Sequence, residues 1–234
     1  MKGGVAMMRL VARELIDDPD VDRAALVASA RGIEASNRRF GGHAVVLREL
    51  DRLRRAGVPV ERLVDVGAGF GDLAEAVVSW GRRYGCSVEV LCIDHHPTIL
   101  DLARKQRGTI PGVTFIAGEG CSLPLQEHGA DVALSTLTLH HLEPCDAVVM
   151  LRELRRVSRA TPIVADLVRG VVPYVLVWLW SRLLARDRLN RHDGPLSVRR
   201  AYTPREALAL AREAGWHEPR VRVTGVLRMV LTDG

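Results

Sequence analysis

The sequence lacks paired cysteines and long apolar runs. Its four cysteines form no C-x-x-C pair and no regular framework, so we expect reduced, mainly buried thiols and a cytoplasmic protein. The longest apolar run covers residues 171–180, whereas a membrane-spanning helix needs roughly twenty apolar residues. Arg9 and Arg13 interrupt the N-terminal stretch, which lacks the continuous apolar region of a secretory signal. The sequence therefore predicts neither a transmembrane segment nor export.

Lysine is almost absent, since only Lys2 and Lys105 occur among 33 basic residues, against 28 acidic residues and a net charge of +5. No basic block dominates, and phosphate binding needs positive charge clustered on one face, so we expect no nucleic-acid partner. The histidines form no i, i+4 pair with a carboxylate at ligand spacing, so the sequence predicts no metal site. With 47% apolar residues, the 234-residue chain can bury a sizeable core.

The most informative stretch is 63–72, LVDVGAGFGD, an apolar run that stops at Gly67, Gly69 and Gly71. A strand followed at once by such a loop and a helix leaves backbone N–H groups facing a ligand, and glycine permits positive φ angles and close approach. The next apolar run ends in Asp94, 23 residues after Gly71. A carboxylate at the end of a neighbouring strand is placed to accept both hydroxyls of a ribose.

At these residues the sequence resembles the class I methyltransferases that use S-adenosylmethionine, and the resemblance covers most of the chain. It continues through 113–124, VTFIAGEGCSLP, and 131–142, DVALSTLTLHHL, whose paired histidines are typical of members with small-molecule substrates. The resemblance implies S-adenosylmethionine as cofactor. The cofactor-binding residues it implies are Asp65, Gly67, Ala68, Gly69, Gly71, Asp94, His95, Glu119, Gly120 and Thr136.

Each acidic residue in this set has a structural alternative. Asp65 would hold the glycine loop and the amino-acid portion of the cofactor, or only the loop amides. Asp94 would bind the ribose or cap the helix from Pro97 onward, and Glu119 would contact the adenine or be an exposed turn acid. A dinucleotide-binding oxidoreductase is disfavoured, because G-x-G-x-x-G would need glycine where Asp72 stands.

Alternation of short apolar runs with helical stretches from residue 61 predicts a Rossmann-like α/β fold, with helices on both faces of a mostly parallel seven-stranded sheet. The expected strands are 61–66, 88–93, 113–116, 131–135 and 162–165, followed by an antiparallel hairpin of 220–224 and 226–231. The expected helices are 72–83, 97–106, 145–158 and 204–214, the last with a capping box from Thr203 to Glu206.

The expected domain organisation is a helical N-terminal cover, 1–60, and a cofactor-binding core, 61–234, with a lid insertion at about 168–200. In the cover, Asp20 is expected to cap a helix that runs through Ala30. The segment 37–43 is either a lid over the cofactor or a turn between two helices with glycine at its C-cap.

The acceptor side is expected on the loop after the fourth strand. His140 and His141 lie there, and a neutral imidazole can take a proton from a hydroxyl near neutral pH. We favour His141, although a structural histidine bonded to backbone fits as well. Asp166, at the end of the fifth strand, would orient such a histidine, bind substrate, or act as a loop acid. We therefore predict His141, His140 and Asp166 as the catalytic residues.

His192 and Asp193 in the insertion, and Tyr202 after it, are candidates for closing over the substrate, but we favour a turn at HDG, because these residue types are typical of turns. Residues 171–184 form an apolar helix whose surface would serve a substrate cavity, a dimer contact or a peripheral membrane contact. A monomer and a homodimer both fit.

The expected function is methyl transfer to an oxygen of an apolar, aromatic or polyketide-like small molecule of secondary metabolism. Two alternatives stay open: carbon methylation of a quinone- or polyketide-type ring, and a non-catalytic cofactor-binding protein of the same fold.

Overall fold

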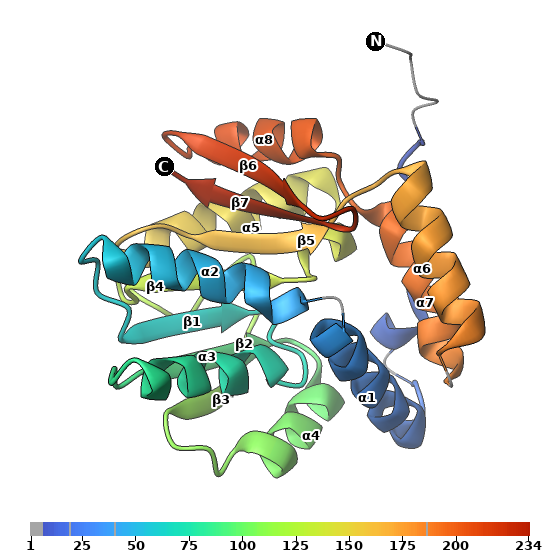
Figure 1. Cartoon of the computed structure of the whole chain (residues 1–234), viewed down its shortest axis with the longest axis horizontal. Coiled ribbons are helices and arrows are strands. Elements are labelled where there is room, and N and C mark those ends of the chain that lie inside the picture. Colours follow the sequence, from blue (N-terminus) through green and yellow to red (C-terminus); the bar gives the residue numbers. More distant parts are fainter. Residues whose placement is uncertain (1–6, 19, 40, 186) are drawn as a thin grey trace.

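The computed structural model describes residues 7–18, 20–39, 41–185 and 187–234, and its centre is a seven-stranded sheet (Figure 1). The strands are β1 Arg62–Val66, β2 Glu89–Asp94, β3 Val113–Ala117, β4 Val132–Thr136, β5 Ile163–Leu167, β6 Pro219–Thr224 and β7 Arg228–Asp233. Their order is β3-β2-β1-β4-β5-β7-β6. The first five strands are parallel, while β7 is antiparallel to β5 and to β6. The predicted α/β fold is confirmed.

Helices cover both faces of the sheet. They are α1 Arg23–Arg39, α2 Gly42–Arg55, α3 Asp72–Arg83, α4 Pro97–Arg107, α5 Pro144–Val157, α6 Val171–Leu183, α7 Arg188–Arg200 and α8 Pro204–Glu213. Successive strand residues point to opposite faces, so Leu63 packs in one core with α2, α3 and α4, and Val64 packs in another with α5 and α8. The expected capping box forms, because Thr203 and Glu206 each bond the other's backbone N–H.

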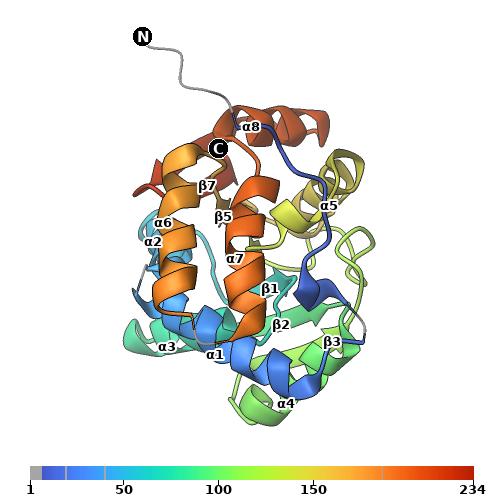
Figure 2. The ribbon, with the colours of Figure 1, turned by 90° about the vertical axis from the view of Figure 1, so that its right-hand side faces the viewer.

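The strand order reverses at β1 and β4, and ligands of such sheets bind beyond the carboxyl ends of the strands at this point. Helices α1, α6 and α7 gather at that end (Figure 1), and they lie across it when it faces the viewer (Figure 2). The short 3-10 turn Leu15–Asp17 contacts α7 there. The chain therefore covers the site with its N-terminal residues and with the segment after β5.

One expectation for the N-terminal region is wrong. The helix expected to end near Ala30 runs to Arg39, and Asp22 rather than Asp20 caps it, because Oδ2 of Asp22 accepts the N–H of Ala25. The segment 37–43 contains a turn between two helices, one of its two expected forms, since α1 ends within it and α2 begins within it, and its role as a lid stays a prediction. Gly41 makes the turn at a φ of 66°, and position 40 lies outside the described residues.

Residues 188–200 form helix α7, so the turn expected at HDG is wrong. Asp187 caps the helix by accepting the N–H of Asn190 at 2.8 Å. A Cβ at Gly194 would lie 2.8 Å from Oγ of Ser181, so glycine lets α7 approach α6 closely. Packing between the two helices outweighs the local preference of Gly194 and Pro195 for a turn. Among the described residues, no helix has the length and apolar content needed to span a bilayer.

Candidate functional site

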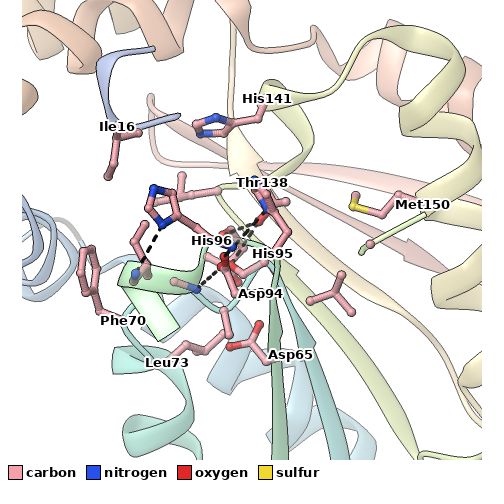
Figure 3. Close-up of a pocket in the computed structure, with 18 of the residues that line it drawn as sticks. Ile16, Asp65, Phe70, Leu73, Asp94, His95, His96, Thr138, His141 and Met150 are labelled. Atoms are coloured by element: carbon pink, nitrogen blue, oxygen red, sulfur yellow. Dashed lines mark hydrogen bonds and ion pairs between the residues drawn. The ribbon is translucent and has the colours of Figure 1, made fainter. Parts of the chain in front are cut away.

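A cavity of about 390 Å³ lies at the carboxyl ends of β1, β2 and β4 (Figure 3). Most of the residues predicted to bind the cofactor line it. They are Asp65, Gly67, Ala68, Gly69, Asp94, His95, Glu119, Gly120 and Thr136. His141, one of the predicted catalytic residues, also lines this cavity. The sequence therefore located the cavity, and the individual roles stay predictions.

The glycine loop needs glycine at each of its three positions. Gly67, Gly69 and Gly71 have φ angles of 70°, 53° and 75°, a region that side chains rarely adopt. A Cβ on Gly67 would lie 2.3 Å from Oγ1 of Thr138, whereas one on Gly69 would meet open space. Gly71 does not line the cavity; it precedes α3 and packs against Phe115. Gly71 thus contributes to the conformation of the loop without contacting the cavity.

Asp94 joins the two loops that frame the cavity. Its Oδ2 accepts the N–H of Gly69 at 2.8 Å, and its Oδ1 accepts the N–H of His96 at 2.9 Å. His96 caps α4 through Nδ1, which accepts the N–H of Ile99 at 3.4 Å. A carboxylate has about four acceptor sites, so Asp94 can hold these loops and still accept hydroxyls of a ribose.

Asp65 lies beneath the cavity with 1% of its surface exposed, and neither carboxylate oxygen has a hydrogen-bond partner among the described residues. Burial, with repulsion from Asp72 and Asp94, raises its pKa to about 8. A buried carboxylate in this state would be stabilised by a cation. S-adenosylmethionine carries an ammonium and a sulfonium group, so the residues present fit the cofactor that the sequence implies.

A second cavity of about 170 Å³ adjoins the first, and both are lined by Ile16, Ile33, Asn37, Leu137 and His141. Helix α6 contributes Val177 and Trp180 to its wall, and α7 contributes Asn190, Asp193, Gly194 and Ser197. The segment after β5 and the N-terminal residues 14–37 therefore each form part of the wall of this second cavity.

His140 and Asp166 form a buried pair at the second cavity. Nδ1 of His140 lies 2.6 Å from Oδ1 of Asp166, and the His140 backbone N–H donates to Oδ2 at 3.0 Å. Burial opposes ionisation of Asp166, but interaction with His140 and backbone hydrogen bonds lower its pKa overall. His140 lines the second cavity, whereas Asp166 lines neither cavity. The geometry gives Asp166 the position of a group that orients His140.

His141 is held by residues that the sequence did not single out. Its Nδ1 lies 3.1 Å from Oδ2 of Asp17, and its Nε2 lies 3.7 Å from Oε2 of Glu14. Glu14 is 4% exposed, and burial raises its pKa to about 7, although His141 and Arg200 oppose the shift. The acids come from a short N-terminal segment without a strong periodic pattern, so sequence spacing gave no sign of them.

Arg228, the first residue of β7, was also missed. It is 5% exposed and lines the second cavity. Its Nη2 donates to Oδ1 of Asn37 at 3.0 Å, while Nε and Nη1 have no hydrogen-bond partner among the described residues. Burial lowers its pKa, although Asp166 and Asp72 oppose the shift. Arg228 thus brings a buried guanidinium, with two nitrogen donors that lack a partner among the described residues, to the wall of the second cavity.

The insertion residues take different positions from those expected. His192 is exposed, and the hydroxyl of Tyr202 donates to the carbonyl of Leu142 at 2.8 Å from a buried position outside both cavities. Asp193 lines the second cavity, but its two oxygens accept the N–H groups of Leu15 and Ile16 at 2.9 and 3.0 Å. Asp193 therefore holds the N-terminal segment against α7, and this segment carries Glu14 and Asp17.

The apolar helix α6 turns most of its side chains outward. Val171, Val175, Trp178 and Leu179 are exposed, so these four do not line the cavity. Arg182 lies over the Trp178 ring at 5.8 Å. Only part of this helix faces the site, and the rest is an apolar outer surface.

The chain is similar to known methyltransferases. A family model described as a methyltransferase domain matches residues 63–161. The demethylmenaquinone methyltransferase of Roseiflexus castenholzii is 27% identical over 179 residues, which cover 70% of this chain and 71% of the relative. An uncharacterised 37.1 kDa protein from a transposon of Streptomyces fradiae is 30% identical over 176 residues, 73% of this chain. The chain spans about half of that relative, since the match covers 48% of its length.

Among solved structures, a SAM-dependent methyltransferase from Aquifex aeolicus superposes with a TM-score of 0.61 at 18% identity. The match covers 91% of this chain and 98% of that chain, and it shows the shared fold. Together with the methyltransferase-domain match, it agrees with the resemblance found at the glycine loop. Residues 63–161 thus match a methyltransferase-domain family model, and the chain has the fold of a SAM-dependent methyltransferase.

Proposed function

We propose that this protein transfers a methyl group to an oxygen of an apolar, aromatic or polyketide-like small molecule. The observation that carries the proposal is the second cavity, which adjoins the cofactor cavity and places two histidines beside it. Its wall combines apolar side chains such as Trp180 and Leu167 with a few buried polar groups, a composition typical of small-molecule sites.

The cofactor would be held by the residues around the first cavity. Asp65 would face its cationic amino-acid end, Asp94 its ribose, and Glu119 with Gly120 its adenine. When bound, the cofactor supplies an activated methyl group and a neutral leaving group, so the protein has mainly to align the acceptor and exclude water. We propose that residues 1–60 and 168–200 together provide this exclusion.

The acceptor hydroxyl would lose its proton at the histidine pair. His141 lines both cavities, so it is the candidate closest to the boundary between cofactor and acceptor. His140 lies in the second cavity and is oriented by Asp166 through a 2.6 Å contact. Arg228, whose Nε and Nη1 have no hydrogen-bond partner among the described residues, would donate to a carbonyl or hydroxyl oxygen of the acceptor and so fix its orientation.

The test is a methyl-transfer assay with radiolabelled S-adenosylmethionine and paired acceptors: apolar phenols and hydroxylated polycyclic aromatics against small polar alcohols and catechols. We expect turnover of the apolar set and loss of more than tenfold in kcat/KM for the polar set. The variant Arg228→Met keeps the length of the side chain, and we expect it to raise KM for the preferred acceptor. Equal turnover of both sets would contradict the proposal.

A second candidate is carbon methylation of a quinone-type ring. It is favoured by the relative from Roseiflexus castenholzii, whose name gives demethylmenaquinone as the molecule that it methylates. The same cavity would hold such a ring, and the same alignment would serve a carbon nucleophile. The position of the new methyl group in the product, measured by carbon-13 NMR, separates the two reactions, because O-methyl and C-methyl carbons have different chemical shifts.

A further inference from the structure

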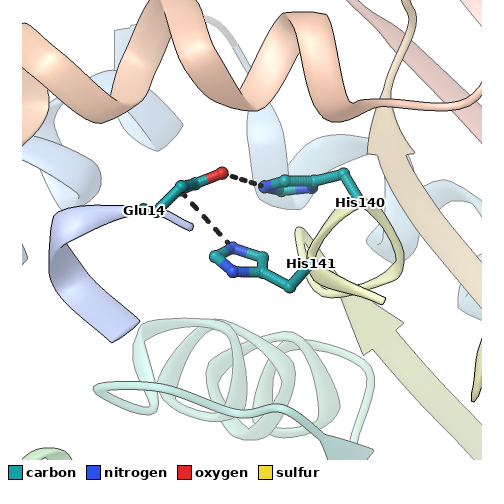
Figure 4. Close-up of side chains that lie close together, drawn as sticks. All are labelled: Glu14, His140 and His141. Carbon is teal, nitrogen blue, oxygen red and sulfur yellow. Dashed lines mark ion pairs between the residues drawn. The ribbon is translucent and has the colours of Figure 1, made fainter. Parts of the chain in front are cut away.

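Glu14, His140 and His141 bring three metal-ligating side chains together beside the second cavity (Figure 4). One ligand atom from each lies within 4.8 Å of the others. We propose that these three residues bind a divalent transition-metal ion through Nε2 of both imidazoles and the carboxylate of Glu14. Binding of the ion stands apart from methyl transfer, while its effect on the acceptor rests on the proposed function.

The distances leave room for an ion. Nε2 of His140 lies 3.7 Å from Oε1 of Glu14, and Nε2 of His141 lies 3.7 Å from Oε2 of the same carboxylate. Both distances are longer than a hydrogen bond. Ligand atoms in a tetrahedral zinc site lie about 3.3 Å apart, because each is about 2.0 Å from the ion. Each Glu14–histidine distance would shorten by about 0.4 Å around a zinc ion. The three ligand atoms lie within 4.8 Å of one another, so the widest pair would approach by up to about 1.5 Å.

A carboxylate lies close to Nδ1 of each histidine and orients its ring. Nδ1 of His140 lies 2.6 Å from Asp166, and Nδ1 of His141 lies 3.1 Å from Asp17. An ionised carboxylate only accepts, so each Nδ1 carries a hydrogen, and the neutral form of each ring would present its lone pair at Nε2. Metal-binding histidines are held in this way in known sites. These two lone pairs face the oxygens of Glu14, an arrangement that a cation between them would stabilise.

The charged groups around the cluster carry an excess of negative charge that a cation would neutralise. Glu14, Asp17 and Asp166 supply three carboxylates, and Arg200 supplies one guanidinium, with Nη1 3.9 Å from Glu14 and 3.5 Å from Asp17. Oε1 of Glu14 is buried and has no hydrogen-bond partner among the described residues. Uncompensated buried charge is costly. With Glu14 ionised and both imidazoles neutral, the state in which they bind a metal, a dication would balance the two excess negative charges of these groups.

The donor set favours zinc or a neighbouring transition metal. Imidazole nitrogens suit Zn²⁺, Fe²⁺ and Cu²⁺, whereas Mg²⁺ and Ca²⁺ prefer oxygen donors. Two histidines and one glutamate with an open fourth position form a donor set of catalytic zinc sites. All three ligands line the second cavity, so the open position would face the acceptor. A hydroxyl bound there would release its proton to water more readily, and the imidazoles would then serve as ligands rather than as bases.

The test is a titration of the metal-free, full-length chain with ZnCl₂ by calorimetry, and with CoCl₂ by visible absorption, which reports on the coordination of the ion. We expect one ion per chain and a Co²⁺ spectrum of low coordination number. Glu14→Gln keeps the shape of the side chain and should weaken Zn²⁺ binding at least tenfold. Asp166→Asn should weaken it about 10- to 100-fold, because it removes the carboxylate that orients His140.

His217→Gln is the matched control. His217 is exposed near the start of β6, which pairs with the end of β7, so it lies at the opposite end of the sheet from Arg228. Its loss should leave Zn²⁺ affinity unchanged. Binding that the control and Glu14→Gln affect equally, or a Co²⁺ spectrum identical to that of the aqueous ion, would overturn the proposal.

Binding of S-adenosylhomocysteine is measured on every variant to show that it is folded. A chain that binds Zn²⁺ but methylates no acceptor contradicts the proposed function and leaves the metal site standing. A chain that methylates acceptors equally with and without a chelator, and binds no Zn²⁺, contradicts the metal site alone. If Glu14→Gln does not fold, the Co²⁺ spectrum of the unsubstituted chain still decides the question.

Discussion

The two cavities of this protein are built in different ways. The predicted cofactor residues of the first cavity lie at the ends of β1, β2 and β4 and in the loops that follow β1, β2 and β3, so each belongs to a local strand-end motif. The second cavity, proposed to hold the acceptor, is assembled from Glu14, His140, Arg228 and the helices after β5, which are far apart in the sequence. A site formed by local motifs can be recognised from spacing, whereas one formed by distant segments depends on tertiary packing.

This difference also appears in the polar groups. Around the first cavity, Asp94 accepts backbone N–H groups, whereas neither oxygen of Asp65 has a hydrogen-bond partner among the described residues. Around the second cavity, Glu14 lies 3.7 Å from both His140 and His141, and Nε and Nη1 of Arg228 have no partner in the described part of the chain. The polar groups around the first cavity are thus mostly fixed by backbone hydrogen bonds. More of those around the second cavity lack a hydrogen-bond partner in the described part of the chain, and a bound molecule could supply one.

The largest expected effect tests whether the cofactor cavity depends on Asp94. Asp94→Asn replaces one acceptor oxygen by an amide and removes the charge, so it weakens both the loop hydrogen bonds and any ribose contact. We expect S-adenosylhomocysteine to bind about 100-fold more weakly by calorimetry, because hydrogen bonds to charged groups contribute about 1.5–3 kcal/mol each. The control is Asp101→Asn, an exposed acid on α4 paired with Arg23 and Lys105. Unchanged affinity of Asp94→Asn would remove Asp94 from the cofactor site.

Glycine at position 67 avoids both backbone strain at a positive φ and a steric clash with Thr138, and two variants separate these effects. Gly67→Ala introduces a Cβ at a φ of 70° and 2.3 Å from Oγ1 of Thr138. Gly57→Ala, at a φ of 76° with nothing within 4 Å, introduces the backbone strain alone. We expect the free energy of unfolding to fall by about 1 kcal/mol for Gly57→Ala and by at least about 2 kcal/mol for Gly67→Ala. Equal losses in urea denaturation would mean that Thr138 yields without cost.

The unpaired carboxylate of Asp65 should make the free energy of unfolding depend on pH. Its pKa of about 8 in the folded chain lies above the ordinary 3.8, so between these values the folded state holds a proton that the unfolded state has released. The free energy of unfolding therefore falls as pH rises through this window. Asp65→Asn removes that slope, and without cofactor it should be more stable than the parent chain at pH 8 by at least about 1.4 kcal/mol, equivalent to one pKa unit.

The measurement is urea denaturation of both chains at pH 5 and pH 8. Glu14, whose pKa is raised to about 7, gives a slope of the same sign in both chains and so cancels in the comparison. The same variant should bind S-adenosylmethionine more weakly, because it lacks the anion for the cationic end. A variant that is less stable than the parent at pH 8 would indicate that Asp65 is ionised and already compensated.

The sequence predicted the features that depend on local motifs and missed those that depend on packing between distant segments. The α/β fold, the strand ends and the cofactor cavity follow from local patterns, since period-two apolar runs, glycines and the carboxylate of Asp94 all lie within single elements. Helix α7 was missed because Gly194 and Pro195 favour a turn locally, and only packing against Ser181 explains them. Glu14 and Arg228 were missed because no spacing connects them to the histidines.

The smallest expected effect tests which side of α6 meets the acceptor. Trp180 lines the second cavity, while Trp178, two residues earlier, is 40% exposed and lies beneath Arg182. Trp180→Ala should raise KM for an apolar acceptor about fivefold, the equivalent of about 1 kcal/mol of lost apolar contact, with little change in cofactor affinity. Trp178→Ala should leave KM within error. If Trp178→Ala raises KM as well, the outer face of α6 takes part in delivering the acceptor, and the separation between an apolar outer surface and an inner cavity wall on this helix no longer holds.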